Sequence, residues 1–142
     1  MLVLDTDVVS ELRKVEAGRA HRQVAAWSEQ VRVGETFLAA ITVHELELGI
    51  LLLERKDKRQ GAILRAWIDT TVLPEFEARI LSIDVAVAQR CAKLHVPDPR
   101  PMRDALIAAT ALVHGMTVVT RNVRDFEPMG VAVLNPWKWE EP

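Results

Sequence analysis

Short, unbroken apolar runs alternate along this sequence with longer segments in which apolar residues recur at helical spacing. A strand with one buried face alternates polar and apolar residues, whereas a strand of a parallel sheet is buried on both faces and is apolar throughout. The pattern therefore predicts an α/β fold, a doubly wound parallel sheet of about five strands with helices on both faces. The expected strands are residues 2–4, 36–40, 80–83, 117–120 and 131–134.

The segments between these strands predict helices, and their ends carry helix start and stop signals. Thr42 and Glu45 have the spacing of a capping box, and Pro101 and Gly115 flank an apolar helical run. No repeat or low-complexity stretch divides the chain, so residues 1–142 are expected to form one domain. The expected helices are residues 7–15, 20–33, 42–56, 59–72, 84–95, 102–114 and a short one after Asn122.

Composition restricts the partners and the location of the chain. Its 18 Lys and Arg residues against 20 Asp and Glu residues give a net charge of −2, which excludes a strongly basic DNA-binding module. The start, MLVLDTDVVSEL, lacks the basic leader of a secretory signal, and Cys91 is the single cysteine. The longest apolar stretch, residues 105–113, is too short to cross a bilayer. We therefore expect a cytoplasmic protein with no membrane span.

Acidic side chains gather where the predicted strands end and where the helices after them begin. The carboxyl ends of parallel strands meet at one edge of the sheet, and ligands bind there. We therefore expect these side chains, delivered by separate segments, to lie close together. The residues concerned are Asp5, Asp7, Glu45, Asp104, Asn122 and Asp125.

Each of these residues, taken alone, also has an explanation as a helix cap or as a partner of a helix dipole. Asp7 is expected to cap the first helix, since aspartate is a good N-cap residue. Glu45 and Asp104, in contrast, lie on the helix faces that point toward the core. Asp5 ends a buried apolar run, where an unpaired carboxylate carries a large desolvation cost.

Carboxylates held close together repel one another and require a positive counter-charge. Arg103 and Arg121 are near in sequence, but a divalent cation is the simpler solution, because Mg²⁺ and Mn²⁺ prefer oxygen ligands. Arg103 is then expected to bind phosphate or to face solvent. A bound cation polarises a phosphodiester and lowers the pKa of a bound water, so the pattern favours metal-assisted hydrolysis.

Four stretches carry a resemblance that spans nearly the whole chain. They are LVLDTDVVSEL at the start, ITVHELELGI at 41–50, RDALIAATALVHGMTVVTRNVRDF at 103–126 and the ending VAVLNPW. In this order they resemble the PIN-domain ribonucleases. Within that superfamily the chain looks most like the VapC-type toxins of type II toxin-antitoxin systems, in the FitB-like branch.

The resemblance implies a single PIN domain that is a Mg²⁺- or Mn²⁺-dependent endoribonuclease, forms a homodimer and is sequestered by a small cognate antitoxin. It implies catalytic and metal-binding roles for four acids: Asp5, Glu45, Asp104 and Asp125. It implies supporting roles for four further residues: Thr6, Asp7, Thr120 and Asn122. Asp7 stands where many relatives have asparagine, and Asn122 stands where some have an acid. Which of Asn122 and Asp125 approaches the metal is therefore left open.

The helix expected at 42–56 is apolar on almost every face at residues 50–53, so part of it is expected to lie against another chain. Trp27 and Trp67 fit either such an interface or the core. The charged run 54–59 is typical of a solvated helix junction. A shallow acidic edge reaches an exposed RNA backbone more easily than a deep A-form groove, so the expected substrate is single-stranded or looped RNA. With only seven aromatic residues, base stacking is limited and selectivity is expected to come from RNA shape.

Two other functions are alternatives to the nuclease. LVLDTDVV also fits the start of haloacid-dehalogenase-like phosphatases, in which Asp5 would be the nucleophile. Those enzymes need a later lysine and an acidic pair after a downstream strand, where this chain has RNVRDF. A non-catalytic PIN-fold binding module would keep the fold without a working metal site. The intact set of acids favours the nuclease over both.

Overall fold

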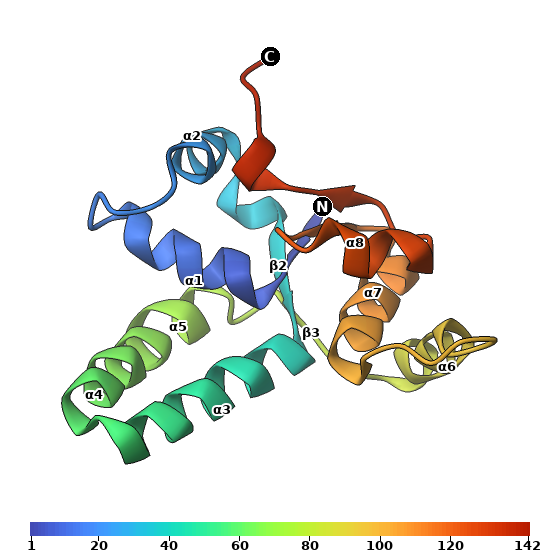
Figure 1. Cartoon of the computed structure of the whole chain (residues 1–142), viewed down its shortest axis with the longest axis horizontal. Coiled ribbons are helices and arrows are strands. Elements are labelled where there is room, and N and C mark those ends of the chain that lie inside the picture. Colours follow the sequence, from blue (N-terminus) through green and yellow to red (C-terminus); the bar gives the residue numbers. More distant parts are fainter.

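The computed structural model describes all 142 residues and has the predicted α/β architecture. Five parallel strands form one sheet in the order β3-β2-β1-β4-β5, with helices on either side (Figure 1). The strands are β1 (Leu2–Leu4), β2 (Thr36–Ala39), β3 (Ile80–Leu81), β4 (Thr117–Val119) and β5 (Val133–Leu134). The expected strands are thus confirmed. The strand order reverses at β1, and ligands bind at such a point in doubly wound sheets.

Each expected helix is present. The helices are α1 (Thr6–Val15), α2 (Arg22–Gln30), α3 (Ala40–Lys56), α4 (Lys58–Trp67), α5 (Leu73–Glu75), α6 (Val85–Leu94), α7 (Met102–His114) and α8 (Val123–Phe126). A π-helical turn at Ile68–Val72 joins α4 to α5, and short 3₁₀ turns lie at Val33–Glu35, Glu127–Met129 and Pro136–Lys138. None of the helices combines the length and the apolar composition that a bilayer crossing requires.

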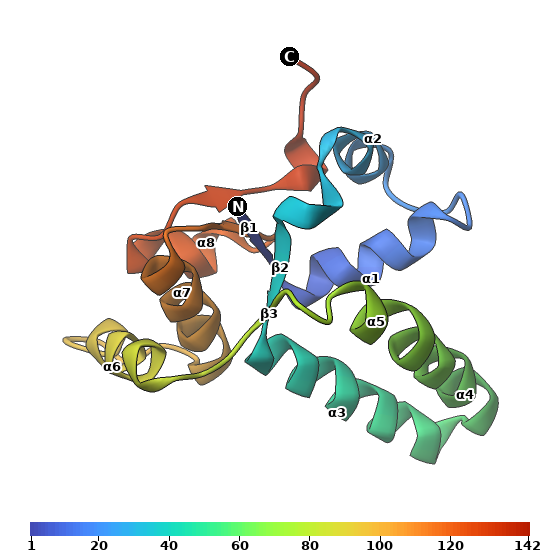
Figure 2. The ribbon, with the colours of Figure 1, turned by 180° about the vertical axis from the view of Figure 1, so that it is seen from behind.

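Both faces of the sheet are buried, which explains the unbroken apolar runs. Val3 and Val118 pack in a cluster with residues of α6 and α7, whereas Leu4 and Val119 pack in a second cluster with residues of α1, α2 and α3. All four side chains are fully buried. Figures 1 and 2 show the same division, with α1 to α5 on one side of the strands and α6 to α8 on the other.

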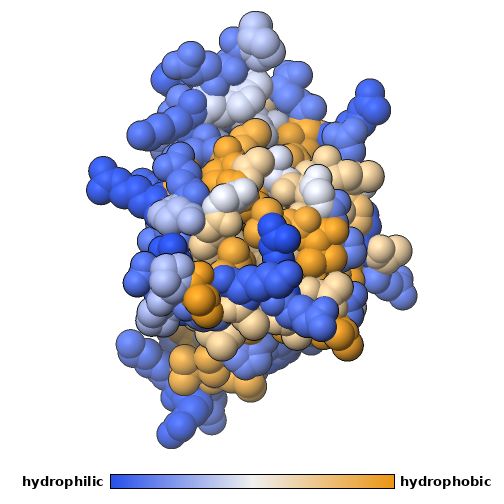
Figure 3. Space-filling view, turned by 90° about the vertical axis from the view of Figure 1, so that its right-hand side faces the viewer, coloured by the Kyte–Doolittle hydropathy of each residue, from blue (hydrophilic) through white to orange (hydrophobic).

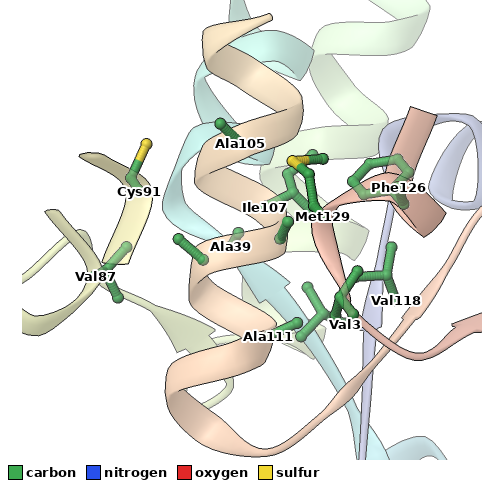
Figure 4. Close-up of a cluster of buried hydrophobic side chains, with 13 residues drawn as sticks. Val3, Ala39, Val87, Cys91, Ala105, Ile107, Ala111, Val118, Phe126 and Met129 are labelled. Atoms are coloured by element: carbon green, nitrogen blue, oxygen red, sulfur yellow. The ribbon is translucent and has the colours of Figure 1, made fainter. Parts of the chain in front are cut away.

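α7 is the most deeply buried helix. Its small and apolar side chains Ala105, Ile107 and Ala111 lie among Val3, Val118 and their neighbours (Figure 4). The helix ends at Gly115, whose φ of 65° is the left-handed conformation that a side chain disfavours, so the predicted stop signal is confirmed. Because α7 packs this tightly on the sheet, the residues in its first turn are held at the carboxyl edge of the strands.

The predicted capping box at the start of α3 is wrong. α3 begins at Ala40, two residues earlier than expected, and its N-cap residue Ala39 makes no side-chain hydrogen bond. Thr42 is fully buried inside the first turn, and its Oγ1 has no hydrogen-bond partner. β2 passes directly into α3 without a loop, so Thr42 is already helical and Glu45 is free to reach another partner.

The tryptophans belong mostly to the core. Trp27 is 3% exposed and Trp137 is 9% exposed, and both lie in the cluster that covers the α1 side of the sheet. Asn135 Oδ1 accepts a hydrogen bond from the Trp137 backbone N–H at 3.0 Å, and Gln23 Nε2 donates to the carbonyl of Trp139 at 3.1 Å. The end of the chain therefore packs back on α2, while Trp67 is only partly buried.

Two areas of apolar surface are exposed. On α3 and α4 the exposed large side chains are Leu48, Leu51, Leu52 and Ile63. Around α6 and α7 they are Ile83, Val85, Val96, Met102 and Val113. Figure 3 shows the side of the molecule that bears α6 and α7, where apolar side chains gather within a hydrophilic border. The helix expected at 42–56 does leave apolar side chains uncovered, although its Ile50 is buried.

The contact between α3 and α4 predicts the effect of a single methyl group. A Cβ added at Gly61 in α4 would lie 2.6 Å from Cγ and 2.7 Å from Cα of Glu54. Gly61→Ala must separate the two helices, and we expect it to lower the free energy of unfolding by about 1–3 kcal/mol in urea titrations. Gly49→Ala in α3 is the control, because a Cβ there meets nothing within 4 Å. We expect Gly49→Ala to raise the free energy of unfolding by roughly 0.5–1 kcal/mol. If Gly61→Ala and Gly49→Ala changed stability equally, the close packing of Gly61 against Glu54 would be contradicted.

Candidate active site

Asp5 ends the central strand and is the N-cap residue of α1. Its side chain is 1% exposed, and hydrogen bonds hold both carboxylate oxygens. Oδ1 accepts from the backbone N–H of Thr6 at 2.8 Å, and Oδ2 accepts from the hydroxyl of Thr120 at 2.8 Å. These bonds fix the Asp5 carboxylate against the end of β4. The expectation that Asp7 caps α1 is therefore wrong, because Asp5 takes that position.

Asp7 lies in the first turn of α1 beside Asp5. Its Oδ2 accepts a hydrogen bond from the backbone N–H of Arg121 at 3.1 Å, and its buried Oδ1 has no hydrogen-bond partner. Burial, followed by the charge of Asp5, raises the pKa of Asp7 from 3.8 to about 6. Asp7 thus ties the loop after β4 to α1, at the cost of a carboxylate whose ionised form is disfavoured.

Three acids converge on one arginine. Arg103 in the first turn of α7 lies with Nη1 2.9 Å from Asp5 Oδ1, Nε 2.8 Å from Glu45 Oε2 and Nη2 2.7 Å from Asp104 Oδ1. The acids come from the end of β1, from α3 and from α7, and Figures 1 and 2 show the starts of α1, α3 and α7 meeting at this edge of the sheet. We refer to Asp5, Glu45 and Asp104 as the acid cluster. The predicted convergence of these acids is thus present in the structure.

Arg103 does not simply face solvent, because its guanidinium pairs with three acids. The other expectation, that it binds phosphate, stays a prediction. Arg103 supplies the positive counter-charge for which a divalent cation was the preferred expectation. Partial burial opposes its charged form, but the combined charges of Asp5, Glu45 and Asp104 outweigh this effect and raise the pKa of Arg103. The local sequence gives no sign of this contact, because Asp5 and Arg103 are 98 positions apart.

Asp104 is the acid least satisfied by its neighbours. It is 5% exposed, and its Oδ1 lies close to Arg103 but in an orientation that makes no hydrogen bond. Burial, with smaller effects from the charges of Asp5, Asp125 and Glu45, raises the pKa of Asp104 against the opposing charge of Arg103. Such a carboxylate favours the approach of a further positive charge.

The donor set fits a hard divalent cation. It consists of carboxylate oxygens, which Mg²⁺ and Mn²⁺ prefer, and two of these oxygens are buried without a hydrogen-bond partner, Asp104 Oδ1 and Asp7 Oδ1. With Arg103 lying among the acids, no three acidic, histidine or cysteine side chains are arranged to hold a metal ion. The chemistry of the cluster suits the ion, although the three acids are not arranged to hold one in this structure, in which Arg103 lies among them.

The remaining predicted residues lie at the rim of the cluster. Asp125, in α8, is exposed, and its negative charge contributes to the raised pKa of Asp104. Asn122 is exposed and is the N-cap residue of α8, but its side chain makes no capping hydrogen bond. Its backbone N–H donates to Thr120 Oγ1 at 3.0 Å. Thr6 supports Asp5 through its backbone N–H, whereas its buried hydroxyl makes no hydrogen bond.

An open groove of about 760 Å³ begins beside Asp125. Its lining includes the basic side chains of Arg121, Arg124 and Lys138, together with Trp137. The guanidinium of Arg121 lies 5.2 Å from the centre of the Trp137 ring. Sequence reasoning did not find this groove, because the chain end that forms one wall carried no spacing signal for a ligand.

Comparison with known proteins identifies the fold family. The PIN domain family matches residues 2–130. This chain belongs to the PIN-domain family. The predicted resemblance, including the VapC-type and FitB-like branch, is confirmed.

Two relatives match this PIN domain over almost its whole length. It is 36% identical over 143 residues to the VapC ribonuclease Y4jK of Sinorhizobium fredii, covering 97% of this chain and 99% of the relative. It is 37% identical over 143 residues to the toxin FitB of Neisseria gonorrhoeae, covering 96% and 99%. The crystal structure of FitAcB from Neisseria gonorrhoeae matches with a TM-score of 0.87 and 35% identity, over 98% of this PIN domain and 100% of that chain.

The raised pKa of Asp7 predicts that replacing its carboxylate increases stability, by an amount that depends on pH. The folded state holds the Asp7 proton more tightly than the unfolded state, so wild-type stability falls as the pH rises from 3.8 through about 6. Asp7→Asn lacks this penalty and is an equally good residue for a helix start. In metal-free buffer we expect the variant to melt about 3 °C above wild type at neutral pH. The difference should shrink as the pH falls toward 4.

Asp98→Asn, in an exposed loop, is the matched control and should leave the melting temperature unchanged at both pH values. A gain for Asp7→Asn that is the same at pH 4 and at neutral pH would show that ionisation of Asp7 is not its cause.

Proposed function

We propose that this PIN domain is a Mg²⁺- or Mn²⁺-dependent endoribonuclease, the toxin of a VapBC-type toxin-antitoxin pair. The observation that carries the proposal is the meeting of Asp5, Glu45 and Asp104, from three distant segments, around one positive charge at the carboxyl edge of the sheet. The relatives named a VapC ribonuclease and a FitB toxin support the same assignment over the full chain.

Asp5, Glu45 and Asp104 would hold the metal ion, and Asp125 would complete the set from the rim. The ion, when bound, polarises the phosphodiester and lowers the pKa of an attacking water. Asp5 is fixed by hydrogen bonds from Thr6 and Thr120. Glu45 and Asp125 are the acids with most access to solvent, so their carboxylate oxygens would orient the ion or accept a proton from the attacking water.

The groove beside Asp125 suits an extended RNA strand. Positive charge for phosphates comes from Arg121, Arg124 and Lys138. Asp125, whose charge raises the pKa of Asp104, lines the same groove. Trp137 is already stacked against Arg121 and is 9% exposed, which leaves little aromatic surface for bases. These features favour single-stranded or looped RNA bound through its backbone. An enzyme with this substrate acts in the cytoplasm.

The partners we propose are a small cognate antitoxin and a second copy of the chain. Exposed apolar side chains on α3 and α4, and on the side of α6 and α7, leave surface for both contacts.

The two alternative functions fit the geometry less well. A phosphatase nucleophile must reach its substrate, yet both oxygens of Asp5 accept hydrogen bonds and the side chain is 1% exposed. A binding module has no need of buried acids whose mutual repulsion must be balanced by an arginine.

Removal of a single buried acid tests the proposal. Asp5→Asn and Asp104→Asn keep the shape of the side chain but lose the charge that holds the cation, so we expect RNA cleavage in Mg²⁺ or Mn²⁺ to fall at least about 100-fold. Cleavage of total RNA is followed by gel and cut-site sequencing, with folding checked by circular dichroism. Asp69→Asn, an exposed acid outside the cluster, should cleave like wild type. Growth arrest by a folded Asp5→Asn variant would refute the nuclease.

The two candidates for the fourth acid can be separated in the same assay. Asp125 acts electrostatically on Asp104, whereas the Asn122 side chain makes no hydrogen bond to the cluster or to α8. We expect Asp125→Asn to lower the cleavage rate by about 10-fold or more and Asn122→Ala to leave it nearly unchanged. The opposite ranking would assign the role to Asn122.

A further inference from the structure

Arg103 engages the acid cluster with its whole guanidinium. Each of its three nitrogens lies within 3 Å of a different acid: Nη1 at Asp5, Nε at Glu45 and Nη2 at Asp104. Nη1 also donates to Glu45 Oε1 at 3.2 Å. No other acid lies within ion-pair distance of this guanidinium.

The oxygens that Arg103 contacts are those that a metal ion needs. A small divalent ion draws its oxygen ligands to about 2.0–2.2 Å around one point. A planar guanidinium places its nitrogens along its edges and keeps the same oxygens farther apart. A metal ion bound among Asp5, Glu45 and Asp104 would take the place that the guanidinium occupies, so the two cations compete for the same three acids. The arrangement of the acids agrees, since no three of them are placed to hold an ion.

Arg103 is also free to leave. Its side chain is 32% exposed at the start of α7, and its contact with Asp104 lacks hydrogen-bond alignment. Water can solvate the guanidinium once it leaves, whereas the buried acids still need a positive charge, which a competing divalent cation supplies. The acids, in contrast, are anchored: Asp5 is 1% and Asp104 is 6% exposed. When a stronger cation competes, the arginine moves and the acids stay.

We propose that Arg103 is a positioning residue that holds the acid cluster together without metal and must be displaced before the metal binds. It balances the repulsion of three acids in the metal-free protein, and it lowers the apparent metal affinity by the fraction of molecules in which it occupies the cluster. The inference rests on the proposed function only in that it treats the acid cluster as the metal site.

The substitution Arg103→Met should change two properties in opposite directions. In metal-free buffer the melting temperature falls, because Asp5, Glu45 and Asp104 lose their counter-charge. In calorimetric titration with Mn²⁺ the variant binds about 10-fold tighter than wild type, because nothing has to be displaced. Equal or weaker Mn²⁺ binding by a folded variant, or a failure of both proteins to bind Mn²⁺, overturns the proposal.

Arg65→Met is the matched control. Arg65 is 28% exposed and pairs with Glu47 at 2.7 Å and Glu54 at 3.2 Å, outside the acid cluster. Its removal deletes an arginine of similar exposure and pairing, so we expect the Mn²⁺ affinity to equal that of wild type. A tightening as large as that of Arg103→Met would show that net charge, and not occupation of the cluster, sets the affinity, and would overturn the proposal.

A measurement on the wild-type protein covers the case in which Arg103→Met fails to fold. The side-chain Nε–H resonance of Arg103 should be protected in metal-free protein and should lose its protection on titration with Mg²⁺. The Nε–H of Arg65 should not change. A protected Arg103 resonance that persists at saturating Mg²⁺ overturns the proposal.

These readouts are independent of RNA cleavage. If Arg103→Met binds Mn²⁺ more tightly while wild type cleaves no RNA, the displacement of Arg103 is supported and the proposed nuclease fails. If wild type cleaves RNA and the Mn²⁺ affinity of Arg103→Met is unchanged, the nuclease stands and the role of Arg103 fails.

Discussion

Repulsion among carboxylates at the end of the central strand is the constraint on which this site depends. Asp5 and Asp104 are buried, and Glu45 joins them from another helix, so the fold concentrates negative charge where water cannot screen it. Such a cluster is stable only with a positive charge at its centre. The protein supplies one from its own chain, and the proposed enzyme exchanges that charge for another.

The sheet was predictable because a strand buried on both faces has an unbroken apolar sequence. Val3 and Leu4 point to opposite clusters, and so do Val118 and Val119, which makes each run apolar throughout. The convergence of the acids was predictable for a related reason, since parallel strands end at one edge. Position in the chain therefore gave the neighbourhood of Asp5 without any knowledge of side-chain conformations.

The partners of individual side chains were not predictable from spacing. Local spacing matched Glu45 with Thr42, but β2 runs into α3 without a loop and Glu45 turns to Arg103. Capping by Asp7 was plausible for the same local reasons, yet Asp5 is both the end of β1 and the N-cap residue of α1. The partner of Glu45 depends on which charges the finished fold brings together, and Asp5 likewise pairs with a residue 98 positions away.

The place of β1 in the sheet has a consequence for the chain as it leaves the ribosome. β1 is synthesised first but lies between β2 and β4, and Asp5 accepts a hydrogen bond from Thr120, 115 positions later. A nascent chain therefore carries its first acid long before it has the strand that fixes it, and contacts this distant in sequence form late. A product truncated before Thr120 therefore lacks the hydrogen bond that fixes Asp5 in the folded chain.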